Sequence, residues 1–305
     1  MAERIEGLIA APFTPMAEDG GVNLAAVEPY ADLLARNGVA GVFACGTTGE
    51  SLLLTVAERM DVARRWADAA AEGFKVIIHV GHNSLAESKA LAAHAAEIRA
   101  YGIGAMGPCF FKPQTIEDLV AFCARVAEAA PALPFYYYHI PGMTGVEFPM
   151  ADFLEAATEA IPTLAGIKYT WEDLMDFGRC LDIEDGRFDL LYGRDETLLA
   201  GLALGARGAV GSTYNFAAPL YVRLMEAFDA GDLDTARDLQ RRSREMIHML
   251  YSTTRAFLPA AKRVMKMVGL DCGPVRPPMR NLTPAEAEHV RAELERLGFD
   301  DYCAK

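Results

Sequence analysis

Two short stretches, PFYYYHI at residues 134–140 and LAGIKY at residues 164–169, decide the fold. Both are mainly apolar and contain aromatic or β-branched residues, which is typical of buried strands. The segment between them has helical periodicity. A strand, a helix and a second strand in this order indicate two parallel strands joined by a crossover helix.

The same unit recurs along the first two thirds of the chain. Similar apolar stretches lie at residues 7–13, 39–44, 75–80, 103–106, 188–192 and 208–211. Eight such units in about 215 residues fit a closed α/β fold, the (β/α)8 TIM barrel. A doubly wound open sheet is the alternative. No G-x-G-x-x-G follows the first stretch and the sequence has no P-loop motif, so nothing indicates a nucleotide-binding fold.

Three predicted helices carry a start signal. Thr55, Ser84 and Thr115 each stand three positions before an acidic residue, which is the spacing of a capping box. We therefore expect helices to begin directly after these residues.

The strand pattern stops after Tyr214. Residues 220–250, 255–268 and 284–297 have helical periodicity, and residues 273–280 (GPVRPPMR) contain three prolines, which predicts a loop. The sequence thus predicts a catalytic barrel over residues 1–215 and a helical extension packed on it over residues 216–305. We expect this extension to serve packing or subunit contacts rather than catalysis.

The composition narrows the class of protein. Of 305 residues, 52% are hydrophobic and the net charge is −13, from 29 basic and 42 acidic residues. This is globular composition, and an acidic surface disfavours nucleic acid and anionic membranes as partners. The six cysteines include no C-x-x-C pair, so we expect reduced thiols and no zinc cluster. Without a signal peptide or a long apolar segment, the expected location is cytoplasmic.

Lys168 is the most informative residue at the predicted strand ends, where (β/α)8 barrels carry their active sites. The chain has only seven lysines, and this one stands late in a buried strand. Burial of an unpaired ammonium is costly and lowers its pKa, and a neutral amine is a nucleophile towards ketones. A structural lysine paired with a carboxylate such as Asp195 is the alternative, and spacing alone leaves both open.

Two further strand ends offer groups for chemistry. Residues 46–49 (GTTG) predict a tight turn rich in N–H and hydroxyl groups that can hold a carboxylate, although an ordinary glycine-bounded turn has the same pattern. Tyr138 is a candidate general acid or base. Strand alternation places Tyr136 and Tyr138 on one face and Tyr137 on the other.

Together these motifs resemble the N-acetylneuraminate lyase / dihydrodipicolinate synthase family of class I aldolases. Residues 46–50 (GTTGE) match its G-[ST]-T-G-E turn, residues 138–141 (YHIP) match its Y-x-x-P motif, and residues 166–168 (GIK) match its Schiff-base lysine strand. The likeness runs over nearly the whole chain. Within the family, the animal-type lyases are most similar, for example over residues 132–141 and 208–215.

The resemblance implies a carbon–carbon lyase that cleaves N-acetylneuraminate to N-acetylmannosamine and pyruvate. Lys168 would form an imine with the substrate, Tyr138 would move the proton, and Thr47 and Thr48 would hold the pyruvate carboxylate, with Thr47 also contacting Tyr138. The residues implied to bind the sugar are Thr170, Gly193, Asp195, Glu196, Gly211 and Ser212. The resemblance also implies a homotetramer and no metal or organic cofactor, since the lysine is the electron sink.

Two positions depart from the family pattern. The synthase branch carries an arginine two residues beyond the proline of the Y-x-x-P motif, but this chain has Met143, which cannot form a carboxylate fork. This difference argues against a dihydrodipicolinate synthase. Many members insert a tyrosine from a neighbouring subunit into the proton relay, and the matching region here has Phe111, which lacks a hydroxyl. What replaces that hydroxyl is open.

Two other functions, and four further polar residues near the predicted strand ends, need separate interpretation. The chain has the features expected of an aldolase for another 2-keto-3-deoxy sugar acid as well. A non-catalytic sugar-acid sensor on a degenerate barrel is disfavoured, because the lysine, tyrosine and threonine motifs are retained together. We expect His79 and His139 to be structural, and the pattern assigns no role to His82 and Asn83.

Overall fold

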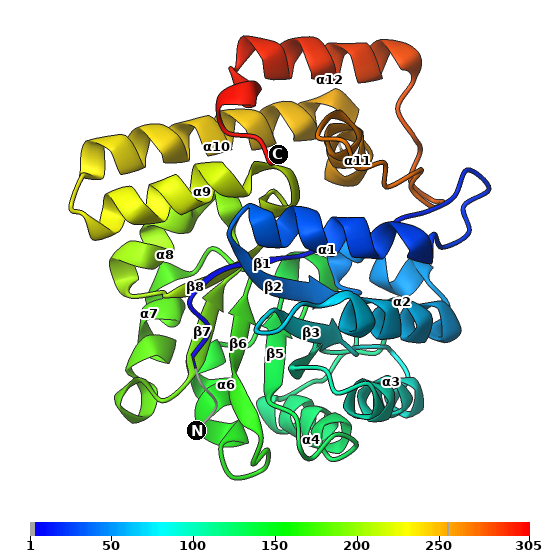
Figure 1. The fold of residues 1–305 in the computed structure, drawn as a ribbon. Helices are drawn as coiled ribbons and strands as arrows, with labels where there is room; N and C mark the ends of the chain where they lie inside the picture. The colour runs from blue at the N-terminus through cyan, green and yellow to red at the C-terminus, as the bar shows by residue number, and fades with distance from the viewer. Residues whose placement is uncertain (1–3, 255) are drawn as a thin grey trace.

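The computed structural model describes residues 4–254 and 256–305, which form a closed barrel of eight parallel strands surrounded by helices (Figure 1). The strands run in chain order around the barrel, and β8 pairs with β1 to close it. The predicted (β/α)8 barrel is therefore confirmed and the open sheet is excluded. The strands are β1 (Gly7–Ala10), β2 (Val39–Ala44), β3 (Lys75–His79), β4 (Gly102–Ala105), β5 (Phe135–His139), β6 (Leu164–Tyr169), β7 (Asp189–Tyr192) and β8 (Gly208–Gly211).

Helices alternate with these strands and continue beyond them. They are α1 (Val27–Arg36), α2 (Val56–Ala69), α3 (Leu85–Glu97), α4 (Ile116–Ala127), α5 (Pro141–Thr144), α6 (Met150–Ala157), α7 (Leu174–Asp182), α8 (Leu198–Leu204), α9 (Tyr214–Asp229), α10 (Leu233–Thr254), α11 (Phe257–Met267) and α12 (Pro284–Arg296). Thr55 and Thr115 form the predicted capping boxes. Ser84 accepts the N–H of Glu87, which is the first half of such a box.

One predicted helix is wrong in its extent. Residues 220–250 are divided between α9, which ends at Asp229, and α10, which begins at Leu233. Gly231 lies between them with φ of +76°, a conformation that glycine adopts without a steric penalty. A single glycine is tolerated within a helical pattern, so its presence alone did not predict the break.

The strand residues separate into two apolar layers. Tyr136 and Tyr138 point into the barrel with Phe43, whereas Tyr137 packs outside it with the helices. This confirms the predicted alternation along β5. Lys168 in β6 is aligned with Tyr138 in β5, so the lysine and tyrosine lie side by side inside the barrel.

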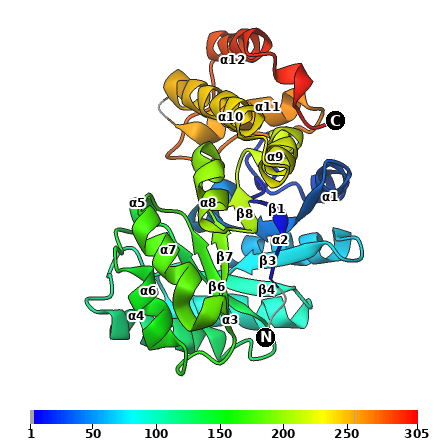
Figure 2. The same cartoon turned by 90° about the vertical axis from the view of Figure 1, so that its left-hand side faces the viewer.

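The C-terminal helices lie together on one side of the barrel (Figures 1 and 2). Helix α10 packs against α9, α11 and α12, and it also contacts the short 3₁₀ helix Asp195–Thr197 that follows β7. Among the described residues, none of the helices has the length and apolarity that crossing a membrane requires.

A buried ion pair joins the turn after β2 to the C-terminal segment. Nζ of Lys262 in α11 donates to Oε1 of Glu50 at 2.7 Å, and the two side chains are 3% and 0% exposed. The same ammonium donates to the carbonyls of Thr14 and Pro274, and Glu50 Oε2 accepts the N–H of Arg276 at 2.8 Å. The C-terminal segment is thereby fixed to the turn that carries the predicted carboxylate-binding threonines.

We expect Lys262→Met to lower the free energy of unfolding by roughly 3–5 kcal/mol, because it leaves the Glu50 carboxylate buried without its partner. Urea titration measures this loss. The matched control is Lys266→Met on the same helix, which removes an exposed ion pair with Asp271 and should cost less than about 1 kcal/mol. Equal losses in the two variants would contradict the prediction.

Candidate active site

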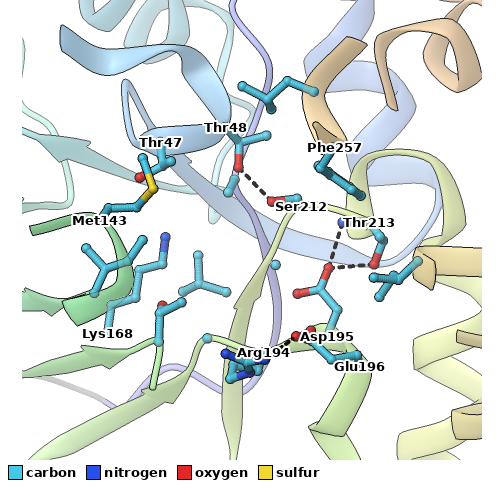
Figure 3. A pocket seen from close by; sticks show the side chains of 18 of the residues that line it. Thr47, Thr48, Met143, Lys168, Arg194, Asp195, Glu196, Ser212, Thr213 and Phe257 are labelled. Carbon is cyan, nitrogen blue, oxygen red and sulfur yellow. Dashed lines mark hydrogen bonds and ion pairs between the residues drawn. The ribbon is translucent and has the colours of Figure 1, made fainter. Parts of the chain in front are cut away.

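A cavity of about 270 Å³ opens at the carboxyl ends of the strands (Figure 3). It brings together all ten residues that the sequence predicted for the site. They are Thr47, Thr48, Tyr138, Lys168, Thr170, Gly193, Asp195, Glu196, Gly211 and Ser212. These residues lie on or directly after β2, β5, β6, β7 and β8, so the closed barrel is what makes distant segments converge.

Lys168 lies between two aromatic rings. Its Nζ is 4.3 Å from the centre of the Phe43 ring and 3.9 Å from the centre of the Tyr138 ring. The residue is 3% exposed, and burial lowers the pKa of its amine to about 7, against the opposing charge of Asp195. Part of the Lys168 population is therefore a neutral amine near pH 7, as nucleophilic attack on a ketone requires.

The alternative role for Lys168, a structural ion pair with Asp195, does not fit the geometry. Within the described residues, no carboxylate lies within 4.0 Å of the Lys168 ammonium. Asp195 Oδ2 instead accepts the N–H and the hydroxyl of Thr213 at 2.7 and 2.6 Å. Burial and the neighbouring charge of Glu196 together raise the pKa of Asp195 to about 6, although the hydrogen bonds from Thr213 oppose the shift.

Tyr138 and Thr47 form a hydroxyl pair beside the amine. Their oxygens are 3.2 Å apart, which matches the contact that the resemblance implies. Burial raises the pKa of Tyr138 to about 12, although the bond with Thr47 opposes the shift. The phenol is therefore protonated at neutral pH, and the pair can pass a proton only by accepting one while donating another.

Small residues and a second hydroxyl pair shape the opposite wall. Thr48 Oγ1 lies 2.6 Å from Ser212 Oγ, which joins the turn after β2 to the end of β8. A Cβ at Gly193 would lie 2.1 Å from Thr170 Oγ1, and one at Gly211 would lie 2.2 Å from Asp195 Oδ1. Glycine at these two positions allows the neighbouring polar groups to approach the strand ends closely.

Two residues that the sequence did not single out support the carboxylates. Thr213 binds Asp195 as described above, and Nη2 of Arg194 lies 2.7 Å from Oε1 of Glu196 and 2.9 Å from Oε1 of Glu172. Both supporting residues are sequence neighbours of predicted site residues. Their polar character was visible in the sequence, but their partners depend on loop geometry.

His79 is packed behind the cavity. Its Nδ1 lies 3.1 Å from the Cys45 carbonyl oxygen and 3.2 Å from Ser51 Oγ, and its ring meets the Tyr138 ring edge-on at 5.6 Å. Burial lowers the pKa of His79 and of His139, so both are neutral at pH 7. Among the described residues, no three His, Cys, Asp or Glu side chains cluster in a way that suits a metal ion.

Asn83 holds the segment that carries the two phenylalanines. Its Oδ1 accepts the N–H groups of Cys109 and Phe110 at 2.9 and 3.1 Å, while Nδ1 of His82 accepts the N–H of Ser84. Phe110 and Phe111 are 76% and 85% exposed. The phenylalanine that matches the missing tyrosine is thus exposed and does not line the cavity of its own chain.

The C-terminal helices contribute an apolar wall that the sequence did not predict. Ile247 and Tyr251 of α10 and Phe257 and Leu258 of α11 line the cavity. The extension was expected to serve packing or subunit contacts, and these four residues show that it also shapes the site. Helical periodicity predicted the helices that carry them but assigned these four residues no contact.

Comparisons with known proteins agree with this geometry. The profile of the dihydrodipicolinate synthetase family matches residues 4–297. The chain is 42% identical to the N-acetylneuraminate lyase of Rattus norvegicus over 97% of this chain and 94% of that protein. Among solved structures, the Proteus mirabilis N-acetylneuraminate lyase is similar with a TM-score of 0.94 and 41% identity, over 97% of this chain and 100% of that one. The N-acetylneuraminate lyase (sialic acid aldolase) of Aliivibrio salmonicida has a TM-score of 0.94 at 38% identity, with 98% of each chain covered.

Because the pKa of Lys168 is lowered, imine formation should depend on pH near neutrality. With pyruvate present, the initial rate should rise through a midpoint near pH 7, because deprotonation produces the nucleophile. Asp195→Asn removes a charge that raises the pKa of Lys168, so the midpoint should move to lower pH. Borohydride quenching and mass spectrometry at each pH measure both effects. A midpoint near 10, the value of an exposed lysine, would contradict this account.

Proposed function

The chain belongs to the dihydrodipicolinate synthetase family, and from that premise we propose that it is a Schiff-base aldolase that cleaves N-acetylneuraminate to N-acetylmannosamine and pyruvate. The observation that carries the proposal is the buried, unpaired amine of Lys168 beside Tyr138. The relatives named N-acetylneuraminate lyase, which match nearly the whole chain, support the choice of substrate.

The first steps use Lys168. Its neutral amine attacks the C2 carbonyl of the open-chain sugar acid, and loss of water together with uptake of one proton from solvent leaves a cationic imine. That cation accepts the electron pair of the C3–C4 bond when the bond breaks, which produces an enamine of pyruvate. The lysine therefore supplies the electron sink that the reaction needs.

Tyr138 and Thr47 move the proton. As C3–C4 breaks, the C4 hydroxyl gives its proton to the Tyr138 oxygen, the phenol gives its own proton to Thr47, and the Thr47 hydroxyl passes its proton to the substrate carboxylate that it binds. N-acetylmannosamine leaves as the aldehyde. The same route runs in reverse to return a proton to C3 of the enamine. Addition of water to the resulting cationic imine then releases pyruvate and one proton and restores the neutral Lys168 amine. The proton lost from the C4 hydroxyl is thus regained at C3.

The remaining site residues bind the two ends of the substrate. Thr47 and Thr48 hold the carboxylate of the pyruvate half in the turn after β2. The sugar half hydrogen-bonds to groups at the ends of β6, β7 and β8, which are Thr170, Gly193, Asp195, Glu196, Gly211 and Ser212. The carboxylates at positions 195 and 196 are suited to accept hydrogen bonds from several sugar hydroxyls.

A related aldolase that acts on another 2-keto-3-deoxy sugar acid is the second candidate, because the lysine and tyrosine serve either substrate equally. Dihydrodipicolinate synthase is disfavoured by Met143, which lines the cavity and is 65% exposed at its mouth. A thioether offers no fork for a second carboxylate. No further cofactor is needed for the proposed steps.

We also propose the organisation of the protein around this activity. Residues 1–215 form the catalytic barrel and residues 216–305 the helical extension packed on it. The contacts of α9 with β1, and of α10 with α8 and the 3₁₀ helix Asp195–Thr197, support this division. A homotetramer follows from the family resemblance, and the exposed Phe110 and Phe111 suit a subunit interface. A monomer in sedimentation equilibrium would contradict it.

A cytoplasmic location follows from the cysteine pattern, and cell fractionation that placed the protein elsewhere would count against it.

Lys168→Ala should abolish cleavage, because it removes the nucleophile. It should leave the fold intact, because the smaller side chain introduces no steric clash. Tyr138→Phe should lower kcat by about 10²–10⁴-fold, the usual contribution of a general acid–base group, and still allow an imine with pyruvate. Pyruvate release and borohydride trapping separate the two effects. Equal loss of imine in both variants would contradict this division of roles.

A substrate panel separates the two candidate aldolases. With N-acetylneuraminate, its acyl variants and shorter 2-keto-3-deoxy acids, kcat/KM for pyruvate release should be highest for N-acetylneuraminate. Comparable values for the shorter acids would favour the second candidate instead.

A further inference from the structure

We propose that Gln240, on the C-terminal helix α10, is a positioning residue that holds the sugar-binding turn after β7 in its working geometry. The inference rests on the proposed function. It gives the helical extension a part in catalysis beyond packing, because a residue outside the barrel would set where the Asp195 carboxylate lies.

The amide of Gln240 is used at both ends. Its Nε2 donates to the carbonyl of Asp195 at 3.0 Å, and its Oε1 accepts the N–H of Leu199 at 2.8 Å. The residue is 2% exposed. One buried side chain therefore binds both sides of the short 3₁₀ helix Asp195–Thr197.

The bond to Leu199 also completes the start of α8. The first N–H groups of a helix have no partner within the helix, and Thr197, at the N-cap of α8, makes no side-chain cap bond. Gln240 supplies this cap from another helix. The turn is thus held by a distant residue where a local residue would ordinarily suffice.

Ser243, one helical turn further along α10, extends the contact to the Asp195 carboxylate. Its hydroxyl lies 3.3 Å from the Asp195 carbonyl oxygen and 2.8 Å from the hydroxyl of Tyr221. Tyr221 and Thr213 are joined at 2.6 Å, and Thr213 donates to Asp195 Oδ2. An ionised carboxylate only accepts hydrogen bonds, so Tyr221 donates to Thr213. Backbone and side chain of Asp195 are thus held from α9 and α10.

The turn has little room to move. Oδ1 of Asp195 packs so closely against Gly211 that a Cβ added at this glycine would lie only 2.2 Å from it. Glu196 follows directly and is bound to Arg194, so a shift of the turn moves both carboxylates. Misplacement of binding groups by about 1 Å is enough to slow an enzyme up to about 100-fold.

The groups that bind pyruvate make no hydrogen bond with Gln240. Lys168 is on β6 and Thr47 and Thr48 follow β2, whereas Gln240 binds only the turn after β7 and the start of α8 within the described part of the chain. Loss of the clamp should therefore weaken binding of the sugar half. It should leave imine formation with pyruvate unchanged at a pH well above 7, where the Lys168 amine is neutral whatever the position of the Asp195 charge. A residue important only for folding would not separate the two steps.

The test compares Gln240→Met with Met246→Leu, a buried substitution on the same helix that leaves the clamp intact. Gln240→Met should lower kcat/KM for N-acetylneuraminate by about tenfold, mainly through KM, as expected when two hydrogen bonds are lost. The rate of imine formation with pyruvate, measured by borohydride trapping at a pH well above the Lys168 midpoint near 7, should stay within about twofold of the wild type. Met246→Leu should change neither.

Gln240→Glu gives a second, pH-dependent readout. Its carboxylate keeps the acceptor for Leu199 but cannot donate to the Asp195 carbonyl, whereas the protonated acid can. Its kcat/KM relative to the wild type should therefore rise as the pH falls. This variant also carries the test if Gln240→Met does not fold.

Three outcomes would overturn the inference: unchanged kcat/KM in Gln240→Met, equal loss of imine formation and cleavage, or a pH-independent ratio for Gln240→Glu. Failure of the proposed function has a different signature, since the wild-type protein would then form no imine with pyruvate at all.

Discussion

The proposed chemistry depends on a buried amine that has no carboxylate of the described residues within 4.0 Å. Nζ of Lys168 lies against the rings of Phe43 and Tyr138 inside the barrel, where the charged form is poorly solvated. An ammonium in such a place loses its proton more easily than one in water, and that loss is what turns a lysine into a nucleophile. The aromatic layer around it therefore has a chemical consequence as well as a packing one.

The C-terminal helices and the barrel share the construction of this site. The buried pair of Glu50 and Lys262 ties the extension to the turn of the carboxylate-binding threonines, and Gln240 ties it to the turn of the sugar-binding carboxylates. The apolar residues of α10 and α11 then close the wall between these turns. Parallel strands bring the functional groups to one end of the barrel, and the extension fixes the loops that carry them.

Local patterns were sufficient for the barrel and for the residues at its strand ends. Short apolar runs specify strands, and closure brings their carboxyl ends to one place, so the polar residues at the strand ends could be named in advance. Contacts that depend on side-chain rotamers and loop conformation could not be predicted. One glycine at position 231 was not enough to predict the turn between α9 and α10. The bonds of Asn83 to Cys109 depend on loop conformation, and the bond from Gln240 to Asp195 joins residues far apart in the chain.

Mapping of the trapped adduct shows whether Lys168 is the nucleophile. The protein is incubated with pyruvate, reduced with borohydride and digested, and the peptides are examined by mass spectrometry. The account predicts one added pyruvate-derived group, located on the peptide that contains Lys168. No adduct, or an adduct spread over exposed lysines such as Lys266, would contradict it.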